Sequence, residues 1–186
     1  MTAATQEGPL TPELAGLLEI EDSEERRRYL TLHPELVRAE LADQLAGNVR
    51  QLVRTDLKEA LRISAAAVAI AEEVAAGECL ARALRARAHA LIFTGQCRPA
   101  VDLLDRTVAL FAEAGQTEEL GRTLSSSIQP LILLGEYARA RRAAGRARRI
   151  FARQSYCAPL GRRSGDPQAR NLRHRSRGSS RARNSH

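Results

Sequence analysis

The sequence predicts an all-α fold in which helices pair into antiparallel hairpins, followed by a C-terminal segment of different composition. Apolar residues recur at spacings of three and four along most of the chain, as expected for helices that bury one face. Hydrophobic residues make up 44% of the chain but aromatic residues only 3%, so the core must consist of small aliphatic side chains. Such cores suit thin, closely spaced helices. A repeat with a period of forty residues indicates the same fold.

The repeat aligns small and apolar residues in three copies. One position is alanine in every copy, at Ala60, Ala100 and Ala140. The second and third copies also share a glycine and a phenylalanine, which chance alignment of an alanine-rich chain does not readily supply. The residues matched between these two copies are Leu84 with Leu124, Leu91 with Leu131, Gly95 with Gly135, and Phe111 with Phe151.

The predicted elements begin with a helical N-terminal segment, residues 1–34. Within it, Thr11–Glu13 (TPE) and Ser23–Glu25 (SEE) each have the composition of a helix start, so we expect two short helices. The repeat domain is predicted to span residues 35–153, in units of about 35–77, 78–115 and 117–153. Residues 154–186 form the last predicted segment.

The first unit is predicted to pair a helix at about 35–53 with a second helix that begins near residue 56. Thr55 stands where the other units have a turn glycine, so this first helix fits the repeat less well. Asp56 and Glu59 form a pair typical of a capping box at the start of the second helix. We expect this helix to end near Gly77.

The second unit is predicted to contain helices over 78–93 and 97–113. Gly95 interrupts the apolar pattern between them, and Gly115 is expected to end the second helix in a left-handed conformation. In the third unit, Thr117 is the expected N-cap, with acidic residues following it in the first turn. This unit is expected to turn at a glycine and to continue as a helix over about 137–153.

Small residues at helix crossings, large aliphatic neighbours and turn glycines together resemble the tetratricopeptide repeat (TPR) superfamily. The resemblance covers residues 36–153 as a forty-residue variant that lacks the usual aromatic early in the first helix and the closing proline. The stretches ALRISAAAVAIAEEV and LLGEYARARRAAGRARRIF are similar to helical arrays that precede CHAT (caspase-like peptidase) domains in large bacterial proteins. Similar arrays occur in multidomain bacterial transcriptional regulators. The resemblance implies a right-handed solenoid of hairpins that acts as a non-catalytic protein–protein interaction scaffold.

In such arrays the first helix of each hairpin lines a concave groove. The resemblance therefore places in the groove the side chains of Arg82, Arg85, His89 and Ile92, together with the aligned Arg122, Ser125 and Gln129. Three arginines suit a protein segment or peptide rich in carboxylates, because guanidinium groups bind carboxylates bidentately. The alternative interpretation is a solvated polar face that has no partner.

Catalytic and metal-binding patterns are not evident. The serines at 125–127 have no histidine or lysine at a suggestive spacing, which argues against a nucleophile. Cys79, Cys97 and Cys157 form no CxxC motif and no cluster with histidine, so neither a disulfide framework nor a zinc site is indicated. Cys79 and Cys97 are expected to be buried as small apolar residues. We therefore predict a protein that is not an enzyme and uses no cofactor or metal.

The last predicted helix carries an arginine stripe, formed by Arg139, Arg142, Arg146, Arg149 and Arg153 at spacings of three and four. Such a row suits the phosphates of a nucleic acid, which is the alternative function, or an acidic partner. The other interpretation is a solvated face at the end of the array. Because end repeats normally need a polar outer surface, the last hairpin also suggests self-association.

The basic character of the chain lies in its C-terminal segment. Residues 154–186 contain eight arginines and one acidic residue, Asp166, and carry the whole formal charge of +7; residues 1–153 hold 21 basic and 21 acidic residues. Apolar periodicity ends there, and the Arg, Ser, Gly and Pro content predicts disorder. The segment is either a basic arm or an out-of-frame extension. The second alternative would make the chain the N-terminal fragment of a longer repeat protein.

The N-terminus has neither a basic start nor an apolar segment, so no secretory signal is expected. No apolar run approaches the length of a membrane-spanning helix. We therefore expect a cytoplasmic location and no membrane partner.

Overall fold

The structure is a computed structural model that describes residues 11–157, with side chains up to residue 153. This range is all-helical: it contains eight α-helices, one short 3₁₀ helix and no strand. The prediction of an all-α fold is therefore confirmed. The helices are α1 (Pro12–Glu19), α2 (Ser23–Leu32), η1 (Pro34–Leu36), α3 (Ala39–Thr55), α4 (Leu57–Val74), α5 (Gly77–Phe93), α6 (Cys97–Glu113), α7 (Thr117–Leu133) and α8 (Tyr137–Cys157).

The chain divides into two compact units, Met1–Ala152 and Arg153–His186. The first contains α1 to α7 and most of α8. The disorder predicted from residue 154 onward concerns 158–186, which lie outside the described residues, except that α8 continues as a helix to Cys157 instead of ending near 153. The side chain of Cys157 also lies outside the described residues.

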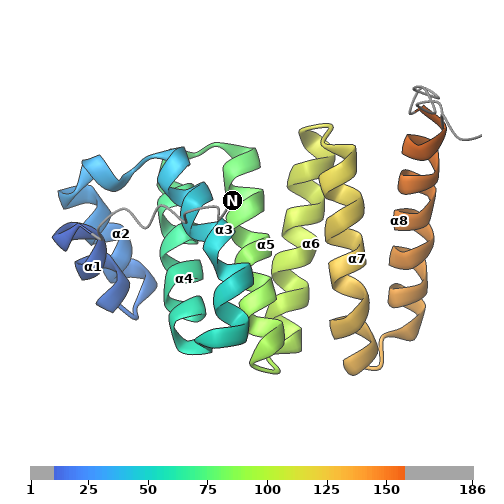
Figure 1. Cartoon of the computed structure of the whole chain (residues 1–186), viewed down its shortest axis with the longest axis horizontal. Helices are drawn as coiled ribbons and strands as arrows, with labels where there is room; N and C mark the ends of the chain where they lie inside the picture. Colours follow the sequence, from blue (N-terminus) through green and yellow to red (C-terminus); the bar gives the residue numbers. More distant parts are fainter. Residues whose placement is uncertain (1–10, 158–186) are drawn as a thin grey trace, which may run out of the picture. The chain divides into compact units, whose positions relative to one another are not determined.

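The forty-residue period recurs in the observed helix starts. Helices α4, α6 and α8 begin at Leu57, Cys97 and Tyr137, and α5 and α7 begin at Gly77 and Thr117. Figure 1 shows α5 with α6, and α7 with α8, as neighbouring helices joined by short turns. The spacing read from the sequence is therefore present in the arrangement of the secondary structure.

Three glycines end helices in the left-handed conformation. Gly95, Gly115 and Gly135 have φ angles of +76°, +68° and +75°. After each of them, the next residue donates its amide to a carbonyl five residues earlier; for Gln96 and Leu91 the distance is 2.9 Å. Because this turn satisfies helix-end carbonyls and requires positive φ, glycine suits it best. The cap expected at Gly115 is confirmed.

Several expected helix ends are wrong by one to four residues. Helix α3 begins at Ala39 rather than near 35, because Pro34–Leu36 form a separate 3₁₀ turn. Gly77 does not end α4: the left-handed residue there is Ala75, with φ +55°, and Gly77 is the first residue of α5. The two-residue connection leaves no room for a glycine turn of the Gly95 type.

The helix starts expected at Thr11, Ser23 and Asp56 are confirmed, and the N-cap expected at Thr117 is wrong. Thr11 and Asp56 cap α1 and α4, accepting the amides of Leu14 and Glu59 at 3.4 and 2.9 Å. Helix α2 begins at Ser23, as expected, and Asp22 is its cap. Thr117 is likewise the first residue of α7 and not its N-cap, and its hydroxyl donates to the carbonyl of Gly115 instead.

Each helix packs mainly on its neighbours in the chain. Helix α3 packs on α4 and α5, α5 on α6, and α6 on α7, while α1 and α2 pack on α4 (Figure 1). The three aligned alanines, Ala60, Ala100 and Ala140, are all buried. Gly121 of α7 lies so close to α8 that an added Cβ would be 3.0 Å from the side chains of Ile150 and Phe151. Small residues thus stand where helices approach most closely.

Cys79 and Cys97 are buried and free, as expected for small apolar residues. Burial is the main cause that raises the pKa of the Cys79 thiol, and it keeps that thiol protonated at neutral pH. Within residues 11–157, no helix is both long and apolar enough to cross a bilayer.

Candidate protein-binding site

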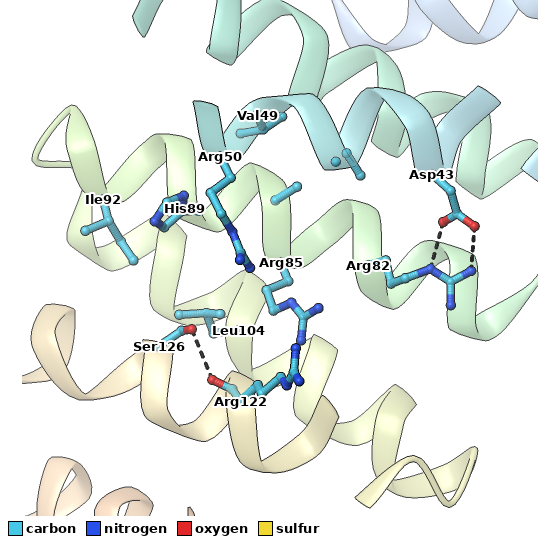
Figure 2. A pocket seen from close by; sticks show the side chains of 13 residues that line it. Asp43, Val49, Arg50, Arg82, Arg85, His89, Ile92, Leu104, Arg122 and Ser126 are labelled. Carbon is cyan, nitrogen blue, oxygen red and sulfur yellow. Dashed lines mark hydrogen bonds and ion pairs between the residues drawn. The ribbon is translucent and has the colours of Figure 1, made fainter. Parts of the chain in front are cut away.

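A cavity of about 730 Å³ is lined mainly by α3, α5 and α7, with Leu104 of α6 also in its wall (Figure 2). Helices α3 and α5 contribute five lining residues each. Arg82, Arg85 and His89 follow one another at helical spacing, so they lie on one face, while Leu84, Ala88 and Leu91 are buried on the other side. The face that lines the cavity is therefore the polar face of an amphipathic helix.

Five of the seven residues that the resemblance assigned to a groove line this cavity. They are Arg82, Arg85, His89, Ile92 and Arg122. Ser125 and Gln129 are exposed on α7 and are not part of the lining, where Ser126 takes their place.

Helix α3 supplies lining residues that the forty-residue alignment did not indicate. Asp43, Ala46 and Arg50 lie at i, i+3 and i+7 on one face of α3. Each of them precedes a lining residue of α5 by 39 positions, so that Asp43 corresponds to Arg82 and Arg50 to His89. Asp56 alone separates α3 from α4. This short connection accompanies the spacing of 39 residues between α3 and α5, one less than the repeat period of forty. A search at an offset of 39 would have found these residues.

Arg82 of α5 is held by Asp43 of α3. The guanidinium Nε and Nη2 donate to the two oxygens of this carboxylate, both at 2.7 Å, as Figure 2 shows. These hydrogen bonds are the main cause that raises the pKa of Arg82 above its ordinary value. The bidentate pair fixes both side chains in one geometry and connects the two helices across the cavity wall.

Arg85 of α5 is held by α7 and α6. Its guanidinium forms an ion pair with Glu119 and lies 5.4 Å from the ring centre of Phe111. Glu119 also lies 3.9 Å from Arg122, which pairs with Glu118 on its other side. The arginines of α5 and α7 thus already have carboxylate partners within the chain.

Arg50 differs from the other cavity arginines because no carboxylate in the described part of the chain pairs with it. Figure 2 shows its side chain extending from α3 toward the middle of the cavity, where Arg85 and Arg122 also point. Next to it, His89 contacts Phe93 edge-on, with ring centres 5.1 Å apart. Burial first, and then the charges of Arg50 and Arg54, lower the pKa of His89 below its ordinary value. At neutral pH the histidine is therefore uncharged.

The serine hydroxyls of α7 beside the cavity are bonded within their own helix. The hydroxyls of Ser125, Ser126 and Ser127 donate to helix carbonyls, at 3.0, 3.1 and 2.8 Å, so none is activated by a neighbouring base. Between 11 and 157, no group of three or more metal-ligating side chains comes together. What remains is a cationic recess with apolar wall residues such as Ile92 and Leu104.

The arginine stripe of α8 has a different environment from the cavity. Arg142, Arg146, Arg149 and Arg153 are exposed, and no acidic residue of the described range pairs with them. Arg139 departs from this pattern: it donates to Glu136 and to Asp105 of α6, both at 2.6 Å, and these bonds raise its pKa. The arginines of the stripe that have no carboxylate partner in the described residues therefore begin at Arg142. This is one helical turn after Arg139, where the sequence places the start of the stripe.

Comparisons with known proteins found no match. No protein-family description matches the chain, and no curated protein or solved structure shows significant similarity to it.

Proposed function

We propose that the chain is a non-catalytic, TPR-like scaffold that binds an acidic segment of a partner protein in the cavity among α3, α5 and α7. In this proposal the helical hairpins form a right-handed solenoid, as in the arrays that precede CHAT domains in bacterial proteins. The observation that carries the proposal is the lining itself: successive helices contribute corresponding residues, 39 or 40 positions apart, to one recess.

Preorganised arginines support binding rather than catalysis. Because Arg82 and Arg85 are fixed by Asp43 and Glu119, little side-chain entropy is lost when a ligand arrives. Arg50 has no such partner in the described residues and offers its guanidinium to an incoming carboxylate. The cavity of about 730 Å³ also has the size of a ligand site.

The apolar part of the lining indicates that the bound segment carries more than charge. Ile92 and Leu104 stand beside the arginines, so an apolar side chain next to the carboxylate would gain contact area. A segment with alternating acidic and aliphatic residues satisfies both halves of the site.

The proposal is tested by selecting binders from a random peptide library on the wild-type chain and measuring their dissociation constants by calorimetry. We expect the selected peptides to be acidic and to lose more than about tenfold in affinity on Arg50→Gln. Ser126→Trp, which fills the recess from α7, should weaken them similarly. Arg106→Gln on α6, outside the lining, is the matched control and should bind as wild type. Peptides that bind all four chains equally would contradict the proposal.

A second candidate function rests on the exposed arginines of α8. Arg142, Arg146 and Arg149 lie along one helix without carboxylate partners in the range 11–157, and such a row suits a phosphate backbone. This function is tested by salt titration of duplex DNA and RNA binding, on the full chain and on a chain without residues 158–186. Steep salt dependence that is lost with Arg142→Gln, Arg146→Gln and Arg149→Gln would favour nucleic acid over protein as the partner.

A further inference from the structure

Two smaller cavities are lined mainly by residues of α1, α2, α4 and α5. They share a pair of arginines in their linings. Their volumes are about 280 and 300 Å³. Arg26 of α2, Ala65 of α4 and Arg87 of α5 line both cavities. Arg26 is only 9% exposed, and Arg87 is partly buried. Arginines from two different helices therefore line the same two cavities.

Neither arginine has a carboxylate partner. Across residues 11–157, the Arg26 guanidinium makes no hydrogen bond or ion pair, and its buried Nε has no acceptor. Arg87 donates only to neutral oxygens, namely the carbonyl of Leu61 and the hydroxyl of Ser64. A buried donor without an acceptor is costly, and arginine does not lose its proton to avoid that cost.

Four of the five acidic residues that line these cavities are paired with other arginines, and the fifth, Glu21, has no ion-pair partner in the described residues. Glu73 lies 3.3 Å from Arg27, and Glu72 lies 3.3 Å from Arg106. Asp22 accepts the amide of Glu25 as the cap of α2. The negative charges of Asp22 and Glu21 act on Arg26 only from beyond ion-pair distance.

The electrostatics agree with the geometry. Burial is the main cause that lowers the pKa of both Arg26 and Arg87, and the charge of Arg26 lowers that of Arg87 further. The two cations are therefore close enough to repel each other while losing hydration. An anion between them would remove the repulsion and supply acceptors for the unused N–H groups.

We propose that Arg26 and Arg87 form a binding site for a small tetrahedral oxyanion of the phosphate class, at the junction of α2, α4 and α5. Cavities of about 280 and 300 Å³ are large enough for an ion of this size together with bound water. Several oxygens on one centre allow the ion to accept hydrogen bonds from both guanidinium groups at once. Bound there, the ion would fasten α2 to α5. This site is independent of the peptide-binding cavity.

The test is thermal unfolding of the full chain in potassium phosphate and in potassium chloride of equal ionic strength, near neutral pH. Between about 1 and about 50 mM phosphate, we expect the melting temperature to rise by about 2–4 °C more than in chloride. Arg26→Met should abolish this difference, because it removes one of the two donors while keeping an apolar stem. Arg28→Met, on the exposed face of the same helix, should retain it. Equal shifts in phosphate and chloride would overturn the proposal.

Phosphorus NMR gives a readout that does not depend on stability. The resonance of inorganic phosphate should broaden on adding the wild-type chain or Arg28→Met, and should stay sharp with Arg87→Met. Should Arg26→Met fail to fold, Arg87→Met carries the comparison, since that side chain is less buried. Broadening that is the same with wild type and a folded Arg87→Met chain would overturn the assignment.

Discussion

The arginines of the cavity and the arginines of α8 are the same residue type in two different settings. In the cavity, Arg82 and Arg85 project from α5 between flanking helices and find carboxylates on α3 and α7. On α8, Arg142 and Arg146 project where no described helix offers a carboxylate. The first pair is held in place before any ligand arrives, whereas the second pair is exposed to solvent.

This difference teaches that arginine content alone does not indicate a binding surface. A fixed guanidinium supports a directed contact at low entropic cost, while an exposed one contributes charge that salt screens. In the proposed function the cavity arginines therefore give specific recognition, and those of α8 contribute only nonspecific attraction.

The largest expected effect comes from removing the aromatic ring beneath Arg85. Phe111 is buried and packs with Leu120, Leu124 and the alanines of α8. Phe111→Ala should lower the free energy of unfolding by about 3–5 kcal/mol, because it leaves a cavity and withdraws the ring from the guanidinium. Urea unfolding measures this loss. A cost below about 1 kcal/mol would show that α6, α7 and α8 do not share this core.

The next effect compares two glutamates of α7. Glu119 forms a sheltered ion pair with α5, whereas Glu118 forms an exposed pair within α7. The side chains of Arg85 and Glu119 are 21% and 28% exposed, and those of Arg122 and Glu118 are 56% and 54% exposed. Glu119→Ala should cost about 1–3 kcal/mol, since it leaves Arg85 half-buried without its partner. Glu118→Ala should cost no more than about 0.5 kcal/mol. Equal costs in urea unfolding would remove the distinction between fixed and free arginines.

A smaller effect is expected from the pH dependence of His89. Its pKa is lowered in the folded chain by burial and by the charges of Arg50 and Arg54. The unfolded chain therefore binds more protons as the pH falls through about 6.5, and stability is lost below that value. Between about pH 7.5 and pH 5.5, the urea midpoint of wild type should fall further than that of His89→Gln. Parallel changes in both chains would contradict a partly buried, neutral histidine in the cavity.

The smallest effect is predicted for α8. Replacing Arg142, Arg146 and Arg149 together by glutamine should change the free energy of unfolding by no more than about 0.5 kcal/mol. The reason is that none of the three has an ion-pair partner within 11–157 to lose. Urea unfolding at low salt is the measurement, and a loss approaching that of Glu119→Ala would mean that the stripe is structural.

Much of the helical fold could be predicted, because apolar spacing and turn glycines act locally. Helices α6 and α7 end beside Gly115 and Gly135 as the sequence indicates. The predictions were wrong at Gly77 and at Thr117. Each was expected to end or cap a helix, but after a short connection each is the first residue of the next helix. Helical spacing put Arg82, Arg85 and His89 on one face of α5, and the resemblance to TPR arrays predicted that this face lines a groove.

The rest of the site depends on how separate helices meet. Asp43 and Arg50 were missed because α3 enters α4 through a single residue, and its register is shifted by one position relative to the other units. The partners of Arg82 and Arg85 lie 39 and 34 residues away, so their pairing depends on interhelical packing that local sequence does not encode. Because burial also depends on interhelical packing, the sequence did not distinguish buried arginines from exposed ones. Arg26, for example, was not predicted to be buried.

The most direct test of the central claim is an NMR titration that follows the side-chain Nε–H signals of the arginines while a selected acidic peptide is added. The account predicts that signals of Arg50, Arg82, Arg85 and Arg122 shift and saturate together, while those of Arg142, Arg146 and Arg149 stay in place. Saturable shifts confined to the arginines of α8, with unchanged signals in the cavity, would contradict it.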